Sequence, residues 1–188
     1  GQFLYVLMME DGSVYKRFQV PNDQNAPIDY NGLVATPKAY NGFLEDWDAP
    51  FDPSEDFTTR VYIGDLQGKV HKLDCEETDP SNWTFTTNAG TEFFDLGNDQ
   101  PITTMVELYR NNTDVYVLVG TGGDQRVDST FQFVALVDEN DSSQGIRVWS
   151  YQLPAGERVF SSPVVGGNVV FFASSAQTLD PALCTMSY

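Results

Sequence analysis

The sequence has 188 residues, of which 41% are hydrophobic and 13% aromatic, so the chain can bury a sizeable core and disorder is not the default expectation. Ten basic against 27 acidic residues give a formal net charge of −17, which argues against nucleic acid or an anionic membrane as a partner. The sequence has no apolar run of about 18 residues to insert into a membrane. Abundant Val, Phe, Tyr, Thr, Gly and Pro favour an all-β chain.

The first predicted element is a hairpin in FLYVLMMEDGSVYKRF, residues 3–18. An aromatic and aliphatic strand is followed by a polar turn with glycine and by a returning strand. A charged residue ends the apolar stretch of this segment too soon for it to be a signal peptide. Because the sequence begins with Gly1, we expect a processed protein or a piece of a longer one.

The same layout returns in RVYIGDLQGKVHKLD, residues 60–74, where Gln67-Gly68 supplies the turn between two alternating strands. Strands of this kind recur in DVYVLVGTGG and GNVVFFASS. The four strands carry equivalent residues at near-regular spacing: Tyr5, Tyr62, Tyr116 and Val170. A shorter segment opened by proline precedes three of them, at Pro37, Pro101 and Pro163, as suits the first residue of a strand.

A unit of antiparallel strands with this period is typical of the blades of a β-propeller. The chain holds about four blades' worth of such strands, and the fourth unit stops soon after its second strand. We therefore predict a single partial β-propeller domain over residues 1–188, with no second domain. Further sequence or another chain would complete a larger propeller.

Four phrases of the sequence resemble the β-propeller domain of the PilY-type type IV pilus proteins, within the wider group of quinoprotein-like propellers. RVYIGDLQGKVHKLD resembles the Arg-Val-Tyr-x-Gly-Asp-x-x-Gly hairpin of that family, and QPITTMVEL is similar to the segment that follows it. VLVGTGGDQRVDSTFQFVALVDEN resembles its Gly-Thr-Gly strand and return, and GERVFSSPVVGGNVVFFAS looks like its Gly-Glu-Arg-Val blade. In this order the phrases cover roughly residues 35–175.

This resemblance implies a non-enzymatic binding and assembly module outside a bacterial cell, at a pilus tip or on the outer membrane. Its partners would be minor pilins or other pilus components, and a host or surface ligand. Two alternatives share the blade pattern. One is a fragment of a quinoprotein dehydrogenase that uses pyrroloquinoline quinone with calcium, and the other is a scaffold propeller of a surface filament or outer-membrane assembly.

An acidic insertion at 42–60 separates the Pro37 segment from the Tyr62 strand. Its candidate calcium ligands are Asp46, Asp48, Asp52, Glu55 and Asp56. Calcium takes about six to eight oxygen ligands, which a loop of this acidity can supply. The resemblance implies a calcium loop at this place, although Thr59 stands where the family has its closing Asp. A solvated acidic loop without metal is the alternative.

Cys75 and Cys184 are the only cysteines. A disulfide between them suits an exported protein, and two buried thiols are the alternative, since a disulfide requires Cα atoms within about 7 Å.

For the other residues that could act in catalysis or ligand binding, we expect structural roles. His71, the sole histidine, lies in a returning strand, where we expect a surface or packing role. With one histidine and no nucleophile motif, the usual catalytic constellations cannot be assembled, so we do not expect an enzyme. Trp47, Trp83 and Trp149 are expected to pack between strands, with a role as ligand platforms as the alternative.

Overall fold

The computed structural model describes residues 2–21, 32–41, 58–77, 79–86, 92–111, 114–123, 129–139 and 142–176. Within these ranges the chain forms fifteen strands and one short 3-10 helix, η2 (Pro80–Asn82), which confirms the predicted all-β class. All strand pairs are antiparallel. The described part contains no helix with the length and apolarity needed to cross a lipid bilayer.

The N-terminal hairpin consists of β1 (Phe3–Leu7) and β2 (Val14–Gln19), in the predicted place. Its turn contains Gly12 at φ 72°, a left-handed conformation that favours glycine.

The first complete sheet, which we call blade A, has the strand order β3-β4-β5-β6. Its strands are β3 (Lys38–Asn41), β4 (Thr58–Gly64), β5 (Lys69–Asp74), β6 (Thr84–Thr86) and β7 (Phe94–Asp95). β6 pairs with the end of β5 and β7 pairs with its beginning. The fourth strand of blade A is therefore interrupted, in two pieces along the same neighbour.

The second complete sheet, blade B, has the order β8-β9-β10-β11. Its strands are β8 (Glu107–Asn111), β9 (Asp114–Gly120), β10 (Gln132–Asp138) and β11 (Ile146–Gln152). Here the fourth strand, β11, pairs with β10 continuously from Gln132 to Val137, with one bulge.

Four short strands follow blade B. They are β12 (Glu157–Val159), β13 (Val164–Gly166), β14 (Val169–Phe171) and β15 (Ser174–Ala176). β13 pairs with β14 as a hairpin, and β12 pairs with β15. Two of the four predicted units are thus complete four-stranded blades in the described part, and a hairpin lies at either end.

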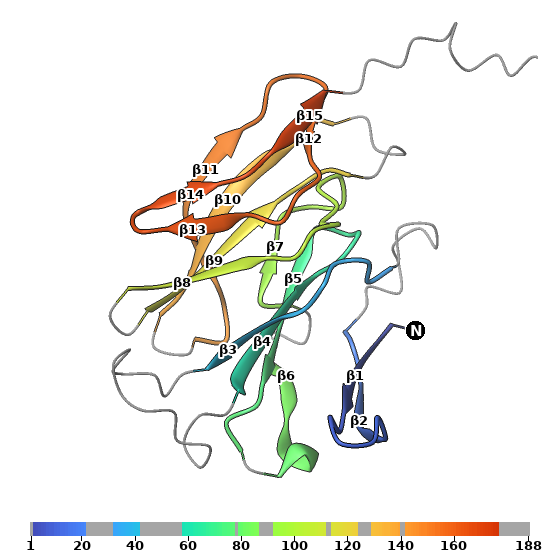
Figure 1. The fold of residues 1–188 in the computed structure, drawn as a ribbon. Coiled ribbons are helices and arrows are strands. Elements are labelled where there is room, and N and C mark those ends of the chain that lie inside the picture. Colours follow the sequence, from blue (N-terminus) through green and yellow to red (C-terminus); the bar gives the residue numbers. More distant parts are fainter. Residues whose placement is uncertain are drawn as a thin grey trace, which may run out of the picture.

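Apolar clusters join these sheets in chain order, and Figure 1 shows the succession from β1–β2 through blades A and B to β13–β14. Phe18 of the hairpin packs with Leu73 of blade A. Tyr62 of blade A shares the largest cluster with Val117 of blade B, and Leu118 on the opposite face of β9 belongs to the cluster that includes Val165. Each complete blade is therefore packed on both faces, as propeller blades are.

The two blades repeat a close contact at the end of their second strands. A Cβ added at Gly64 would lie 2.3 Å from Ile102 Cγ2, and one at Gly120 would lie 2.5 Å from Val159 Cγ1. The Ile102 amide donates to the Asp65 carbonyl (2.9 Å), and the Val159 amide donates to the carbonyl of the residue after Gly120 (3.1 Å). Glycine is required at both positions because the next unit crosses directly over the strand.

One prediction about the prolines is wrong. Pro37 and Pro163 directly precede β3 and β13, but residues 101–106 form no strand and β8 begins at Glu107. The Pro101 carbonyl instead accepts a hydrogen bond from the Gly122 amide (2.8 Å), so this proline lies in the crossing segment before the blade.

Candidate functional site

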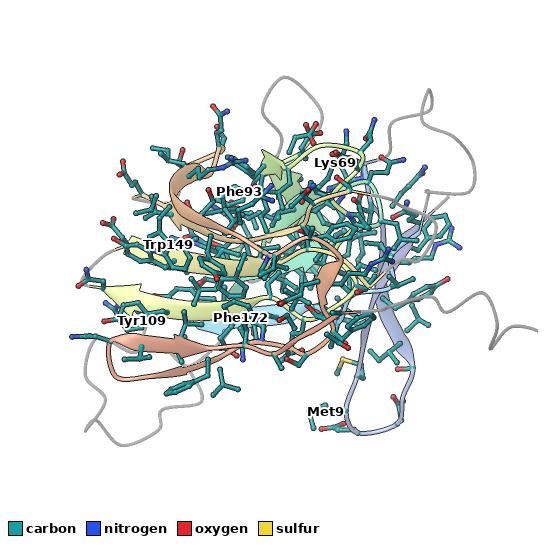
Figure 2. The ribbon with its side chains drawn as sticks, turned by 90° about the horizontal axis from the view of Figure 1, so that it is seen from above. Met9, Lys69, Phe93, Tyr109, Trp149 and Phe172 are labelled. Atoms are coloured by element: carbon teal, nitrogen blue, oxygen red, sulfur yellow. The ribbon has the colours of Figure 1, made fainter. Side chains whose placement is uncertain are left out.

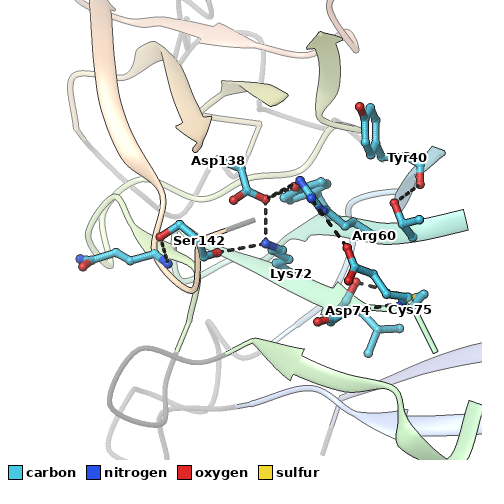
Figure 3. Close-up of polar contacts among 12 residues, drawn as sticks. Tyr40, Arg60, Lys72, Asp74, Cys75, Asp138 and Ser142 are labelled. Carbon is cyan, nitrogen blue, oxygen red and sulfur yellow. Dashed lines mark hydrogen bonds and ion pairs between the residues drawn. The ribbon is translucent and has the colours of Figure 1, made fainter. Parts of the chain in front are cut away.

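A buried polar cluster joins blades A and B around Asp138, the last residue of β10. Lys72 Nζ lies 2.7 Å and Arg60 Nη1 3.3 Å from Asp138 Oδ2, and the Tyr62 hydroxyl donates to the same oxygen. Lys72 Nζ also donates to the Ser142 carbonyl (3.0 Å). Figure 3 shows these contacts running from strands of blade A to the end of β10. The side chains of Asp138 and Lys72 are 0% and 1% exposed, so the cluster lies between the blades and away from solvent.

The surroundings keep the Tyr62 phenol protonated. Burial raises its pKa well above the ordinary value, and the negative charge of Asp138 raises it further. The phenol is therefore a hydrogen-bond donor to Asp138 throughout the neutral range. The Lys72 ammonium also lies 5.6 Å from the centre of the Phe93 ring, a cation–π contact that helps to offset its burial. Together these contacts hold the two blades in one register.

A second buried polar group shapes the turn between β4 and β5. Asp65 Oδ1 accepts hydrogen bonds from the amides of Gln67 and Lys69, both at 2.9 Å, and Asp65 Oδ2 is 2.8 Å from His71 Nε2. The side chains of Asp65 and His71 are each 1% exposed. His71, predicted to have a surface or packing role, is thus a buried partner of this turn.

The predicted calcium ligands Asp46, Asp48, Asp52, Glu55 and Asp56 lie outside the described residues. The flanks of their segment are described: Asn41 at the end of β3 pairs with Thr58 at the start of β4. Residues 42–57 therefore leave and re-enter blade A at one end of a strand pair, and the last residues of the predicted insertion belong to β4. In the described ranges no group of three or more His, Cys, Asp or Glu side chains is arranged to hold a metal.

The Cys75 side chain is buried, and its thiol donates to the Leu73 carbonyl (3.7 Å). Burial, and then the charge of Asp74, raise the pKa of the Cys75 thiol to about 12. Cys184 lies outside the described residues, so the disulfide between the two cysteines remains a prediction.

Two of the three tryptophans lie in the described part, and both stack on a phenylalanine. Trp83 stacks on Phe18 at 6.2 Å, and its indole N–H donates to the Glu77 carbonyl. Trp149 of β11 stacks on Phe133 at 6.0 Å, yet it remains 41% exposed. Both tryptophans therefore pack on another ring, and both also line a cavity, of about 330 Å³ at Trp83 and about 460 Å³ at Trp149.

The interblade cluster was not predicted from the sequence. One signal for it is present, because Arg60 and Tyr62 alternate on one face of β4 and Lys72 lies directly opposite Tyr62 on β5. Arg60 and Lys72 put two cations on one face of this strand pair, which indicates an anionic partner in addition to Asp74, the residue opposite Arg60. Nothing in the local sequence points to Asp138 as that anion.

No protein-family model matches the sequence, and no curated protein matches it. The structure is similar to the crystal structure of the Pseudomonas aeruginosa PilY1 C-terminal domain, with a TM-score of 0.66 and 16% sequence identity. The match covers 93% of this chain and 50% of that chain, so the present chain spans about half the length of that structure. The chain therefore has the fold of the matched half of the propeller-type PilY1 C-terminal domain, which confirms at the level of the fold the resemblance that its sequence predicted.

Proposed function

We propose that the chain is a binding and assembly module of a PilY-like, type IV pilus-related protein, and that it works outside the cell without catalysing a reaction. The observation that carries this proposal is the likeness to the PilY1 C-terminal domain over 93% of the chain. The four phrases that resemble the PilY-type family support it, because they lie in the same order within the two blades and the strands after them.

The described structure supports a role in display. Blades A and B are fixed to each other by apolar packing and by the Asp138 cluster, so they form a rigid support. Segments that connect strands on such a support carry contacts to partners, as binding loops on rigid scaffolds do. Minor pilins or other pilus components, and a host or surface ligand, are the partners of this proposal.

Calcium modulation is part of the proposal. The five acidic candidates Asp46, Asp48, Asp52, Glu55 and Asp56 lie in the segment that leaves blade A after β3 and returns at β4. A divalent cation held there would neutralise part of the −17 charge and fix the segment against the blade. The contact that this segment makes with a partner would then depend on calcium.

The proposal is tested in the bacterium that makes the chain, by deleting its coding sequence. We expect fewer surface pili in sheared fractions and weaker attachment, both restored by the wild-type gene. Complementation with the five acidic residues changed to Asn or Gln would restore protein level but not full attachment. Normal piliation and attachment in the deletion strain would refute the pilus-related role. An absorbance spectrum of the purified protein that shows bound quinone would favour the dehydrogenase alternative instead.

A further inference from the structure

A cavity of about 460 Å³ lies between blade B and the hairpin β13–β14. Its wall holds the aromatic side chains of Tyr109, Tyr116 and Trp149 and the amides of Asn111 and Asn168, and the rest is aliphatic or glycine. The volume falls in the range of about 300–1,000 Å³ that is typical of sites for small ligands. Figure 2 labels Tyr109 and Trp149 on blade B and Phe172 after β14.

The cavity lies on the face of blade B that corresponds to the face of blade A with the Tyr62–Lys72 pair, and Leu118 of its wall is the counterpart of Tyr62. On blade A, Tyr62 and Lys72 are directly opposite each other and fill the space towards blade B. The corresponding pair on blade B is Leu118 and Ala135, which also lie directly opposite each other. Leu118 is two residues before Gly120 at the end of β9, as Tyr62 is two residues before Gly64 at the end of β4. Replacement of a lysine by an alanine at this position removes both the volume and the charge that close the first interface.

The lining of the cavity selects a neutral ligand. None of its lining residues is Asp, Glu, Lys or Arg, although the chain as a whole has a net charge of −17. A charged ligand would be desolvated there without a partner of opposite charge, at a large cost in free energy. A neutral ligand with both apolar surface and hydroxyl groups meets no such penalty.

Trp149 offers a fixed aromatic surface. Its ring stacks on Phe133 with an interplanar angle of 27°, and Phe133 stacks on Phe172 at 4.2 Å and 4°. A tryptophan supported in this way loses little conformational entropy when a ligand packs on it. The C–H face of a sugar ring is an apolar surface of suitable shape for such a ring.

The two asparagines supply the polar contacts. The Tyr109 hydroxyl donates to Asn168 Oδ1 (3.2 Å), so this bond orients the amide at the turn between β13 and β14. The NH₂ group of the same amide carries two donors, and Asn111 adds a second amide with both donors and acceptors. Amides that both donate and accept match sugar hydroxyls, which do the same.

We infer that this cavity binds a neutral saccharide, with Trp149 against the face of a sugar ring and Asn168 and Asn111 on its hydroxyls. The inference goes beyond the pilus-related proposal and does not rest on it. The saccharide can be a sugar in solution or the end of a surface glycan, since the contacts involve one or two sugar units in either case.

The test uses the 188-residue chain. Saturation-transfer NMR is recorded with glucose, galactose, mannose and N-acetylglucosamine up to about 10 mM, which covers dissociation constants in the millimolar range. An array of neutral glycans is probed in parallel. Transfer from soluble sugars alone identifies a solution ligand, binding on the array identifies a surface glycan, and either result supports the inference. The absence of both would overturn it.

Variants locate the site. Trp149→Ala and Asn168→Asp are each expected to weaken binding at least about tenfold, whereas Trp149→Phe retains part of it because a ring remains. The matched control is Tyr15→Ala, since Tyr15 is an aromatic residue on β2, 52% exposed, that does not line the cavity. Unchanged thermal unfolding shows that each variant is folded. Equal loss in Tyr15→Ala and Trp149→Ala, or full binding by Trp149→Ala, would show that the sugar does not occupy this cavity.

Discussion

Lys72 of blade A and Asp138 of blade B form an ion pair of 2.7 Å in the middle of the interface between the two complete blades. Both side chains are almost fully buried, so their charges depend on each other and on Arg60. Removing one partner of such a pair leaves a buried charge without compensation, which costs far more than an exposed ion pair contributes.

We expect Asp138→Asn to lower the free energy of unfolding by about 3 kcal/mol or more, because two buried cations lose their carboxylate. The measurement is urea unfolding followed by fluorescence. The control is Glu139→Gln, which makes the same change of charge at the neighbouring exposed position and should have little effect. Adding Lys72→Met to Asp138→Asn should recover part of the loss. Equal stability of the two single variants would contradict this role of Asp138.

Asp65→Ala should destabilise the chain by roughly 2–3 kcal/mol, since the amides of Gln67 and Lys69 and the ring of His71 all lose a buried acceptor. Asp95→Ala is the matched control: Asp95 also accepts a backbone hydrogen bond, from Gly97, but is exposed. We expect the control to cost less than about 1 kcal/mol. If the two variants lose a similar free energy of unfolding in urea, the burial of Asp65 does not make its hydrogen bonds more stabilising than that of the exposed Asp95.

Gly64→Ala should cost about 1–3 kcal/mol through overpacking, because the new methyl group would overlap the Ile102 side chain. In a double-mutant cycle, the cost of Gly64→Ala should fall when Ile102 is already alanine. Gly166→Ala serves as control, since a Cβ there meets only an ordinary contact at 3.6 Å with Phe171. A cost that does not change in the Ile102→Ala background would mean that the strain lies elsewhere.

Stability should fall in alkaline solution through Cys75. In the unfolded chain its thiol ionises near the ordinary pKa of 9.0, whereas in the folded chain the pKa is raised to about 12. The folded state therefore keeps this contribution below pH 9 and loses it as the pH rises towards 12, by roughly 1 kcal/mol at pH 10. Urea unfolding of Cys184→Ser under reductant, with and without Cys75→Ala, isolates the effect of Cys75. An identical pH dependence of the two proteins would contradict it.

The disulfide state of Cys75 has to be determined before this experiment. Intact-mass analysis without reductant shows whether Cys75 and Cys184 form a disulfide. If they do, the alkaline loss should appear only after reduction.

Calcium titration tests the acidic segment. Isothermal titration of the 188-residue chain should show binding with a dissociation constant of about 0.1–1 mM, the range of extracellular calcium sites. Changing Asp46, Asp48, Asp52, Glu55 and Asp56 to Asn or Gln should abolish it. A double variant of Glu10 and Asp11 at the exposed turn of β1–β2 controls for the loss of acidic charge. No heat at millimolar calcium would end the metal hypothesis and leave a solvated acidic loop.

The hairpins were predictable because their signals are local. In β4 and β5 the alternation of side chains and the Gly68 turn fall within fifteen consecutive residues, so residues 60–74 were predicted in their observed form. The strand after Pro163 was predicted for the same reason.

The contacts between units were not predictable in this way. Asp138 meets Lys72 only when two separate sheets pack together, and one sequence does not show which anion faces which cation. The division of the fourth strand of blade A into β6 and β7 also depends on pairing with β5, because pieces of three and two residues carry no periodicity of their own. Pro101 was misplaced because a proline before an apolar run can open a crossing segment as well as a strand.

The carboxylate of Asp138 also limits how the gene segments that encode the two blades can be exchanged by recombination. A duplicated blade can replace its neighbour by recombination only if the newcomer brings side chains that fit the surface it meets. Blade A presents Arg60, Tyr62 and Lys72 to a single acidic residue of blade B, so a substitute for either blade without the matching partner would bury unpaired charge. Blades A and B are therefore expected to be exchanged together in related genes, with breakpoints before β3 or after β11 rather than between them.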